Sequence, residues 1–365
     1  MAVPPEHACI SSCGCPSDDC TQAPKKKPIY LTTHPREPTR SPSQHPFGSQ
    51  MKSVLAFASL LSPALAATYS RSQNIVGTGF YNAFNFEAIG DPTHGRVNYV
   101  NKATAQAQNL TFASANKFVL RADAHTVISD SSGTGRNSVR IRTNAQYTTH
   151  VAVFDIQHMP EGCGTWPAIW ETDEPSWPNG GEVDILEGVN NVSPNQITLH
   201  TAAGCSMPAS RTQTGTSLQL DCNVAVNGNT GCGVHAPTAN SYGPAFNAAG
   251  GGWYAVERTS TFINVWFWSR GASNVPAAVR SGGATVNTDN WGTPTANFPN
   301  NSCNFPRFFS ANNIIINLTF CGDWAGQAAI YSSSGCPSTC VNFVDQNPTA
   351  FTNAYFEFNS INIYQ

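Results

Sequence analysis

Three carboxylates stand close together in one short segment of the chain. The segment reads Glu182-Val-Asp184-Ile-Leu-Glu187. Successive side chains of a strand point to opposite faces, so Glu182 and Asp184 would share a face that regular pleating denies to Glu187. A β-bulge near Ile185 and Leu186 absorbs one residue and returns Glu187 to that face. The spacing therefore predicts a bulged strand that displays three acids in a row.

Two carboxyl groups held this close can cleave the bond between two sugars. The Cα atoms of Glu182 and Glu187 would lie roughly 13 Å apart, and inward-leaning side chains would bring the carboxyl groups to about 5–5.5 Å. At that separation one Glu attacks the anomeric carbon, while the other protonates the leaving oxygen and then activates water, with retention of configuration. Asp184 would hydrogen-bond to the nucleophile and help to separate the pKa values of the two Glu residues.

The alternative is that the three acids form the polar face of a solvent-exposed strand. We favour the chemical interpretation because only 11% of the residues are charged and tryptophans flank the segment.

The elements that must position these acids are β-strands. Alternating runs rich in β-branched and aromatic residues, bounded by Gly, Asn, Pro or Ser, occur at 138–143, 151–156, 253–268, 313–320 and 355–364. No 11-residue window has a helical stripe of apolar residues. The pattern predicts an all-β fold, a jelly-roll sandwich of two antiparallel sheets with a concave substrate cleft, in a single domain over residues 67–365.

The residues before this domain resemble a processed leader. Met51 and Lys52 precede a short apolar run that ends in Ala64-Leu-Ala66, which is typical of a secretory signal peptide over residues 51–66. Residues 1–50 precede that signal and are interpreted as an extension from an over-long gene model. The mature protein is predicted to begin at Ala67 and to be extracellular.

The cysteines agree with an oxidising compartment. Eight of the twelve follow Met51, which predicts up to four disulfides with 105 possible pairings. A zinc site is disfavoured because Cys336 and Cys340 have no second pair nearby. Sequons for N-glycosylation occur at Asn109, Asn191, Asn300 and Asn317.

Composition excludes several classes of function. The net charge is −3, so no basic surface for nucleic acid is expected. No apolar segment reaches the about 20 residues of a membrane span, so no membrane association is expected after processing. We expect a monomer without cofactor or metal.

The segment Glu182 to Glu187 resembles the active-site strand Glu-x-Asp-x-x-Glu of glycoside hydrolase family 16. The similarity to its fungal laminarinase branch, the endo-1,3(4)-β-glucanases, extends through 91–100, 162–168, 196–200 and 321–326. The resemblance implies a β-jelly roll and a retaining mechanism, with Glu182 as nucleophile, Asp184 as assisting acid and Glu187 as general acid/base. Family 16 transglycosylases and lichenases have a shorter motif without the bulge, so the longer form favours a laminarinase.

Aromatic residues are the expected sugar contacts. All eight tryptophans lie between Trp166 and Trp324, and sugars stack their C–H faces on such rings. Trp170, Trp177 and Trp324 match family positions that line the cleft, and His200 matches a position near the acid/base. Trp266 and Trp268 are expected in the core instead.

The leading hypothesis is a secreted endo-β-glucanase that hydrolyses β-1,3 linkages, with mixed β-1,3/1,4-glucans as a second substrate class. Two alternatives stay open: a cell-wall glucan transglycosylase, and a lectin-like domain that binds glucan without cleaving it. A binding module would have no need of an acid/base pair.

Overall fold

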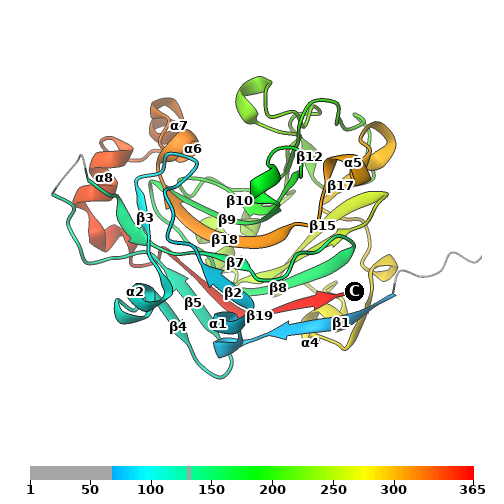
Figure 1. Cartoon of the computed structure of the whole chain (residues 1–365), viewed down its shortest axis with the longest axis horizontal. Coiled ribbons are helices and arrows are strands. Elements are labelled where there is room, and N and C mark those ends of the chain that lie inside the picture. The colour runs from blue at the N-terminus through cyan, green and yellow to red at the C-terminus, as the bar shows by residue number, and fades with distance from the viewer. Residues whose placement is uncertain (1–67, 130–132) are drawn as a thin grey trace, which may run out of the picture. The chain divides into compact units, whose positions relative to one another are not determined.

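Two large antiparallel sheets form the fold of this chain (Figure 1). The computed structural model describes residues 68–129 and 133–365, so the predicted signal peptide and the extension before it lie outside the described residues. Strands occupy all five runs predicted from alternation, and two of them match to the residue, at Asn313–Phe320 and Tyr355–Tyr364. The run at 253–268 is a hairpin of two strands rather than one. The all-β jelly-roll prediction is confirmed.

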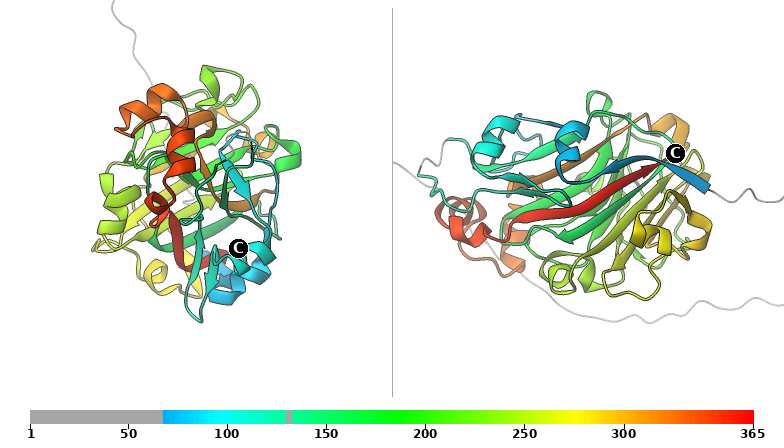
Figure 2. Two further views of the ribbon diagram at one scale, coloured as in Figure 1. Left: turned by 90° about the vertical axis from the view of Figure 1, so that its left-hand side faces the viewer. Right: turned by 90° about the horizontal axis from the view of Figure 1, so that it is seen from below.

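The nine-stranded sheet brings the first and last described strands side by side (Figure 2, right). Its path is β16 (Thr285–Asn287), β1 (Thr68–Ile75), β19 (Tyr355–Tyr364), β8 (His150–His158), β14 (Gly252–Arg258), β15 (Phe262–Ser269) and β17 (Ala296–Pro299); β5 (Phe118–Arg121) pairs with β19, and β4 (Thr111–Ala113) with β5.

The eight-stranded sheet carries the three carboxylates on a central strand. Its order is β12 (Thr216–Ser217), β13 (Val234–His235), β11 (Gln196–His200), β10 (Glu182–Glu187), β9 (Thr165–Thr172), β18 (Asn313–Phe320), β7 (Arg140–Thr143) and β2 (Phe84–Phe86). A separate parallel pair consists of β3 (Val97–Tyr99) and β6 (Arg136–Ser138).

Helices in the described residues are short and connect the strands. The α-helices, of which the longest has seven residues, are α1 (Phe80–Ala83), α2 (Lys102–Ala107), α3 (Gly243–Ala248), α4 (Ala277–Ser281), α5 (Phe305–Phe308), α6 (Gly322–Ala325), α7 (Ala328–Ser333) and α8 (Cys340–Gln346). Single 3-10 turns occur at Gly77–Gly79, Glu174–Ser176, Asn227–Asn229, Ala239–Ser241, Thr288–Asn290, Asn300–Ser302 and Pro348–Phe351. No helix in the described ranges could cross a bilayer.

The main core fills the space between the two sheets. Inward-facing residues of alternate positions, such as Phe154 on β8, Ile169 on β9 and Val183 on β10, are all fully buried there. A second apolar cluster lies on the opposite face of the nine-stranded sheet and holds Trp253, Trp266, Trp268 and Trp291. Trp266 and Trp268 are buried, but they lie in this second cluster and not in the core between the sheets. Side chains on β15 alternate between the two faces, and these two point away from the eight-stranded sheet.

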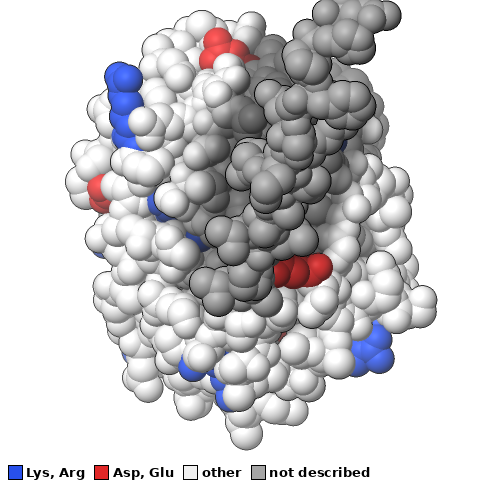
Figure 3. Space-filling view, turned by 90° about the vertical axis from the view of Figure 1, so that its right-hand side faces the viewer, with Lys and Arg blue, Asp and Glu red and all other residues white. Residues whose placement is uncertain are grey.

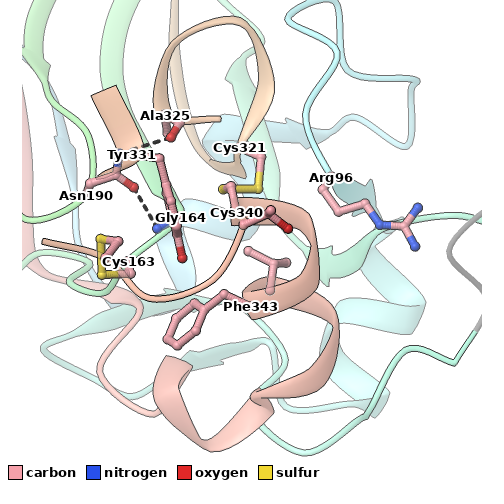
Figure 4. Close-up of a disulfide and its surroundings, with 12 residues drawn as sticks. Arg96, Cys163, Gly164, Asn190, Cys321, Ala325, Tyr331, Cys340 and Phe343 are labelled. Carbon is pink, nitrogen blue, oxygen red and sulfur yellow. Dashed lines mark hydrogen bonds between the residues drawn. A yellow bond between two sulfur atoms is a disulfide. The ribbon is translucent and has the colours of Figure 1, made fainter. Parts of the chain in front are cut away.

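Four disulfides stabilise the loops that connect the strands: Cys163–Cys336, Cys205–Cys303, Cys222–Cys232 and Cys321–Cys340. They use all eight cysteines that follow the predicted signal peptide, as expected. Two of them attach the helical segment α6–α8 to the end of the eight-stranded sheet (Figure 4). A zinc site at Cys336 and Cys340 is thus ruled out, because both sulfurs are in disulfides.

A buried ion network links the sheets across the core. Glu171 on β9 accepts from His150 on β8 at 2.9 Å and lies 3.5 Å from Arg258 on β14. Burial raises the pKa of Glu171, but His150 and Arg258 together hold it below its ordinary value. Because the nine-stranded sheet supplies both partners of Glu171, this carboxylate helps to fix how the two sheets pack.

Replacing Glu171 with glutamine is expected to destabilise the fold by about 3 kcal/mol, because it leaves Arg258 buried without a counter-charge. Urea unfolding followed by tryptophan fluorescence measures this loss. The matched control is Glu357→Gln, which breaks a more exposed ion pair with Lys117 and should cost less than about 1 kcal/mol. Equal losses in the two variants would show that the buried network contributes no more than a surface pair.

Candidate active site

Strand β10 contains the bulge that the spacing of the acids predicts. Against β9, Asp184 pairs with Trp170 while Leu186 pairs with the adjacent Ile169, so Ile185 is the additional residue. Against β11, the register shifts over the same interval, between Asp184 and Glu187. The predicted bulge is confirmed.

The bulge puts all three acids on one face of the sheet. Directly paired residues of antiparallel strands point the same way, and the partners on β9 are two residues apart: Glu182 pairs with Thr172, Asp184 with Trp170 and Glu187 with Ala168. The residues between the acids, Val183, Ile185 and Leu186, are all fully buried in the main core. The carboxylates therefore face away from the core.

Asp184, the central acid, is poised to carry a proton. Its side chain is almost wholly buried, and its pKa lies well above the ordinary value because of this burial, the charges of Glu182 and Glu187, and a hydrogen bond with Glu182. A protonated Asp184 can donate to Glu182 and leave the negative charge there. This is the arrangement that a nucleophile requires.

Glu187 has the properties of a general acid. Desolvation raises its pKa, the indole of Trp166 opposes that rise by donating a 2.8 Å hydrogen bond, and the charge of Glu182 adds to it, which gives a pKa of about 7. A carboxyl group that titrates near neutral pH can both donate and accept a proton under working conditions.

The sequence-predicted tryptophans surround the acids, each from a different element. Trp177 follows the turn Glu174–Ser176, is 43% exposed and donates from Nε1 to Glu182 Oε2 at 2.5 Å. Trp170 on β9 donates to Asn317 at 2.8 Å, and the Arg140 guanidinium lies 5.1 Å from its ring centre. The structure thus places Trp177 at the first acid and Trp170 beside the central one.

Trp324 packs against Trp166, which donates a hydrogen bond to the third acid, Glu187. Its ring meets that of Trp166 edge to face, with centroids 5.7 Å apart. Trp324 is on α6, and the buried side chain of Asn190 anchors this helix: its Nδ2 donates to Ala325 O at 3.0 Å and its Oδ1 accepts from Gly164 N at 2.7 Å (Figure 4). The family motif at 321–326 is thereby held against the end of β9.

His200 on β11 pairs with Glu182 and lies beside the central acid. Its Nε2 is 3.4 Å from Asp184 Oδ2, and its Nδ1 is 2.9 Å from Asn229 Oδ1. The Nδ1 side of the ring therefore faces Asn229, away from the acids. His200 is thus nearer to Asp184 than to the acid/base position that the resemblance implies.

Three comparisons with known proteins bear on this site. The family model described as "XgeA-like, catalytic GH16 domain" matches residues 84–364. The chain belongs to glycoside hydrolase family 16. A solved structure of laminarinase 16A from Phanerochaete chrysosporium, with β-glucans in its donor and acceptor sites, is 64% identical to this chain. It superposes with a TM-score of 0.81 and covers 82% of this chain and 100% of that one.

Curated relatives in the family are longer than this chain. A probable glycosidase of Schizosaccharomyces pombe is 42% identical over 82% of this chain and 70% of its own length. A probable endo-1,3(4)-β-glucanase of Neosartorya fischeri is 42% identical over 87% of this chain and 49% of its own length. The chain spans about half the length of most of the curated relatives that it matches.

Sequence reasoning missed two residues of this family 16 site. Trp166 shares the outward face of β9 with Trp170, two positions before Ala168, so the alternation of the strand could have identified it. Asn195 lies in the loop before β11 and gave no periodic signal, yet its side chain bonds to both sides of the bulge.

Three residues of this cluster also have the spacing of a cation site. One ligand atom from each of Glu182, Asp184 and His200 lies within 4.8 Å of the others. The raised pKa of Asp184 works against such a role, because a protonated carboxyl is a poor metal ligand. These residues therefore fit proton chemistry better than metal binding.

Trp166→Phe is expected to raise the pKa of Glu187 further, because it removes the hydrogen bond that lowers that pKa. If catalysis requires protonated Glu187, the activity of the variant should then persist to higher pH. A pH profile of kcat/KM measures this shift. An alkaline limb that stays in place or moves to lower pH would contradict this account. Trp268→Phe, in the second apolar cluster, controls for the loss of an indole elsewhere.

Proposed function

We propose that residues 68–365 form the catalytic domain of a retaining endo-β-glucanase that hydrolyses β-1,3 linkages, with mixed β-1,3/1,4-glucans as a second substrate class. The observation that carries the proposal is the row of acids on β10, in which a buried Asp184, with a pKa raised well above its ordinary value, separates Glu182 from a Glu187 whose pKa is about 7. The β-glucans bound by the 64% identical laminarinase support the choice of substrate.

The mechanism follows from these positions. The Glu182 carboxylate attacks the anomeric carbon while Glu187 gives its proton to the glycosidic oxygen, so the C–O bond breaks and a glycosyl ester forms on Glu182. Glu187, now ionised, takes a proton from water, and the hydroxide oxygen displaces Glu182 from the anomeric carbon. The separation of the two carboxyl groups, about 5–5.5 Å in such a mechanism, stays a prediction.

The sugar contacts are also proposed. Trp177 presents an exposed ring at Glu182. Trp170 lies on the strand next to the acid row, and Trp324 packs against Trp166, which bonds to Glu187. Stacking of pyranose faces on these rings would hold the chain across the sheet, and His200 would help to orient Asp184. We also propose that the domain is a monomer, which sedimentation at working concentration tests.

Product analysis on laminarin, lichenan and barley glucan in parallel tests the activity. Internal cleavage should release a ladder of oligosaccharides, and proton NMR of the first products should show the β anomer. A first product with the α anomer would exclude double displacement, and glucan that binds without being cleaved would favour the lectin-like alternative.

One observation supports a second candidate. A family 16 structure described as an elongating β-1,3-glucosyltransferase is 35% identical, with a TM-score of 0.75. A transferase would pass the glycosyl ester to a second sugar instead of water. Products longer than a single short donor, appearing early in the reaction, would favour transfer over hydrolysis.

We also propose that the domain is secreted, with residues 51–66 removed as a signal peptide. The four disulfides support an oxidising compartment. Mass determination of the exported protein should place the first residue at Ala67, and retention of residues 51–66 would contradict the proposal.

Glycans on the secreted protein are expected at two of the four sequons. Asn109 and Asn300 are both exposed to solvent. Asn317 is almost fully buried between Trp170 and Tyr99, and the amide oxygen of Asn191 accepts from Gly162 N at 2.6 Å. Enzymatic deglycosylation in heavy-oxygen water should therefore label Asn109 and Asn300; a label at Asn317 would contradict the buried position.

A further inference from the structure

A β-bulge leaves some backbone groups without a hydrogen-bond partner on the neighbouring strand. Here one side chain, that of Asn195, bonds to two such groups. Asn195 Oδ1 accepts from Glu187 N at 2.8 Å, and Asn195 Nδ2 donates to Ile185 O at 3.1 Å. The amide thus bonds on both sides of Leu186, across the interval where the register shifts. Ile185 is fully buried and Glu187 is partly buried, and a buried backbone group left unpaired would cost about 1–3 kcal/mol.

Asn195 is itself held in place on all sides. The residue is fully buried. Its backbone N donates to Ser241 Oγ at 3.0 Å, and its carbonyl accepts from Ala236 N at 2.9 Å. Ser241 Oγ in turn donates to Thr238 O at 2.6 Å. The bulge is therefore fastened to a fixed loop, and not only to its neighbouring strands.

The carboxamide of Asn195 suits the bulge better than most other side chains would. The bulge presents one donor and one acceptor, and a carboxamide supplies one of each in a single plane. An ionised Asp could accept from Glu187 N but could not donate to Ile185 O. An aliphatic residue of the same size could do neither.

We propose that Asn195 is a positioning residue for Glu187, one that locks the bulge and thereby aims the acid/base at the glycosidic oxygen. Without the lock, β10 can relax toward regular pleating, and a shift of one residue turns Glu187 toward the core. A misplacement of even about 1 Å can cost roughly 10²-fold in rate. The inference rests on the proposed role of Glu187.

The test exploits the leaving group. Laminarin needs protonation by Glu187 as its bond breaks, whereas a 2,4-dinitrophenyl glycoside of a β-1,3-linked glucose disaccharide does not, because dinitrophenolate leaves unaided. For Asn195→Ala we expect kcat/KM on laminarin to fall by roughly 10²-fold while kcat/KM on the aryl glycoside stays near the wild-type value. An equal loss on both substrates, or no loss on laminarin, would overturn the proposal.

Three further variants keep the outcome decisive. Asn195→Asp is the substitution closest in shape; it should show the same selective loss if Asn195→Ala does not fold. Asn362→Ala, which removes another buried amide on β19 of the nine-stranded sheet, should leave the ratio of the two rates unchanged. The double variant Asn195→Ala, Glu187→Ala should be no slower on laminarin than Glu187→Ala alone, because the residue to be aimed is absent.

Glu187→Ala also separates this inference from the proposed function. If that variant shows no dependence on the leaving group, the assignment of Glu187 as acid/base has failed. If it shows the dependence and both Asn195 variants do not, only the positioning role is refuted.

Discussion

Glu182→Gln should abolish turnover of laminarin while the protein folds normally. General acid–base catalysis contributes roughly 10²–10⁴-fold, and this variant should lose more than that, because an amide cannot form the glycosyl ester on which both steps depend. Reducing-end release over hours, at high enzyme concentration, measures the residual rate.

The control for this prediction is Glu161→Gln, a carboxylate that bonds to Asn247 and Asn353 and has no contact with the acid row. It should retain wild-type activity. Circular dichroism and the thermal midpoint should be unchanged in Glu182→Gln, since its partner Trp177 is exposed. Wild-type turnover in the folded Glu182 variant would refute the assignment of the nucleophile.

Surface charge is consistent with a neutral polysaccharide as substrate. On the face shown in Figure 3, the Lys and Arg residues that the structure describes are separated by uncharged surface. A basic surface that follows phosphates would place them together. Recognition of the proposed glucan would then depend on aromatic stacking and on hydroxyl hydrogen bonds, and Trp177 is the most exposed of the tryptophans proposed to contact it.

The fold and the acid row were predictable because both follow from local periodicity. Alternation defines β18 and β19 to the residue, and a single extra residue between Asp184 and Glu187 requires a bulge wherever both must face the substrate. These are properties of consecutive residues, which one sequence displays directly.

The supports of the site were not predictable, because they join residues that the sequence keeps apart. Asn195 meets the bulge from a loop, Asn190 fixes α6 across 135 positions, and Glu171 depends on His150 and Arg258 from the other sheet. The disulfide pairing has the same character, since proximity in space selects one of 105 arrangements. Such contacts supply hydrogen-bond partners to polar groups that become buried when the strands pack. No local sequence pattern predicts these contacts.

Glu187→Ala is the second large effect expected, and its pH dependence makes it specific. Below a pH of about 7 Glu187 is protonated and can supply its proton; as the pH rises through that value kcat/KM on laminarin should fall. The alanine variant should lose roughly 10²–10⁴-fold on laminarin and should also lose this alkaline limb. The dinitrophenyl glycoside should still form the glycosyl ester on Glu182, whose breakdown then becomes slow for want of a base.

Added azide should restore turnover of that substrate, because it attacks the ester without needing a general base. The product should be the β-glycosyl azide, since two displacements on one carbon retain its configuration. An α-glycosyl azide would mean direct displacement and would contradict the role of Glu182 as well. Failure of azide to restore turnover, with ester formation intact, would mean that Glu187 does more than move a proton and that its removal has disturbed the bulge on which the acid row depends.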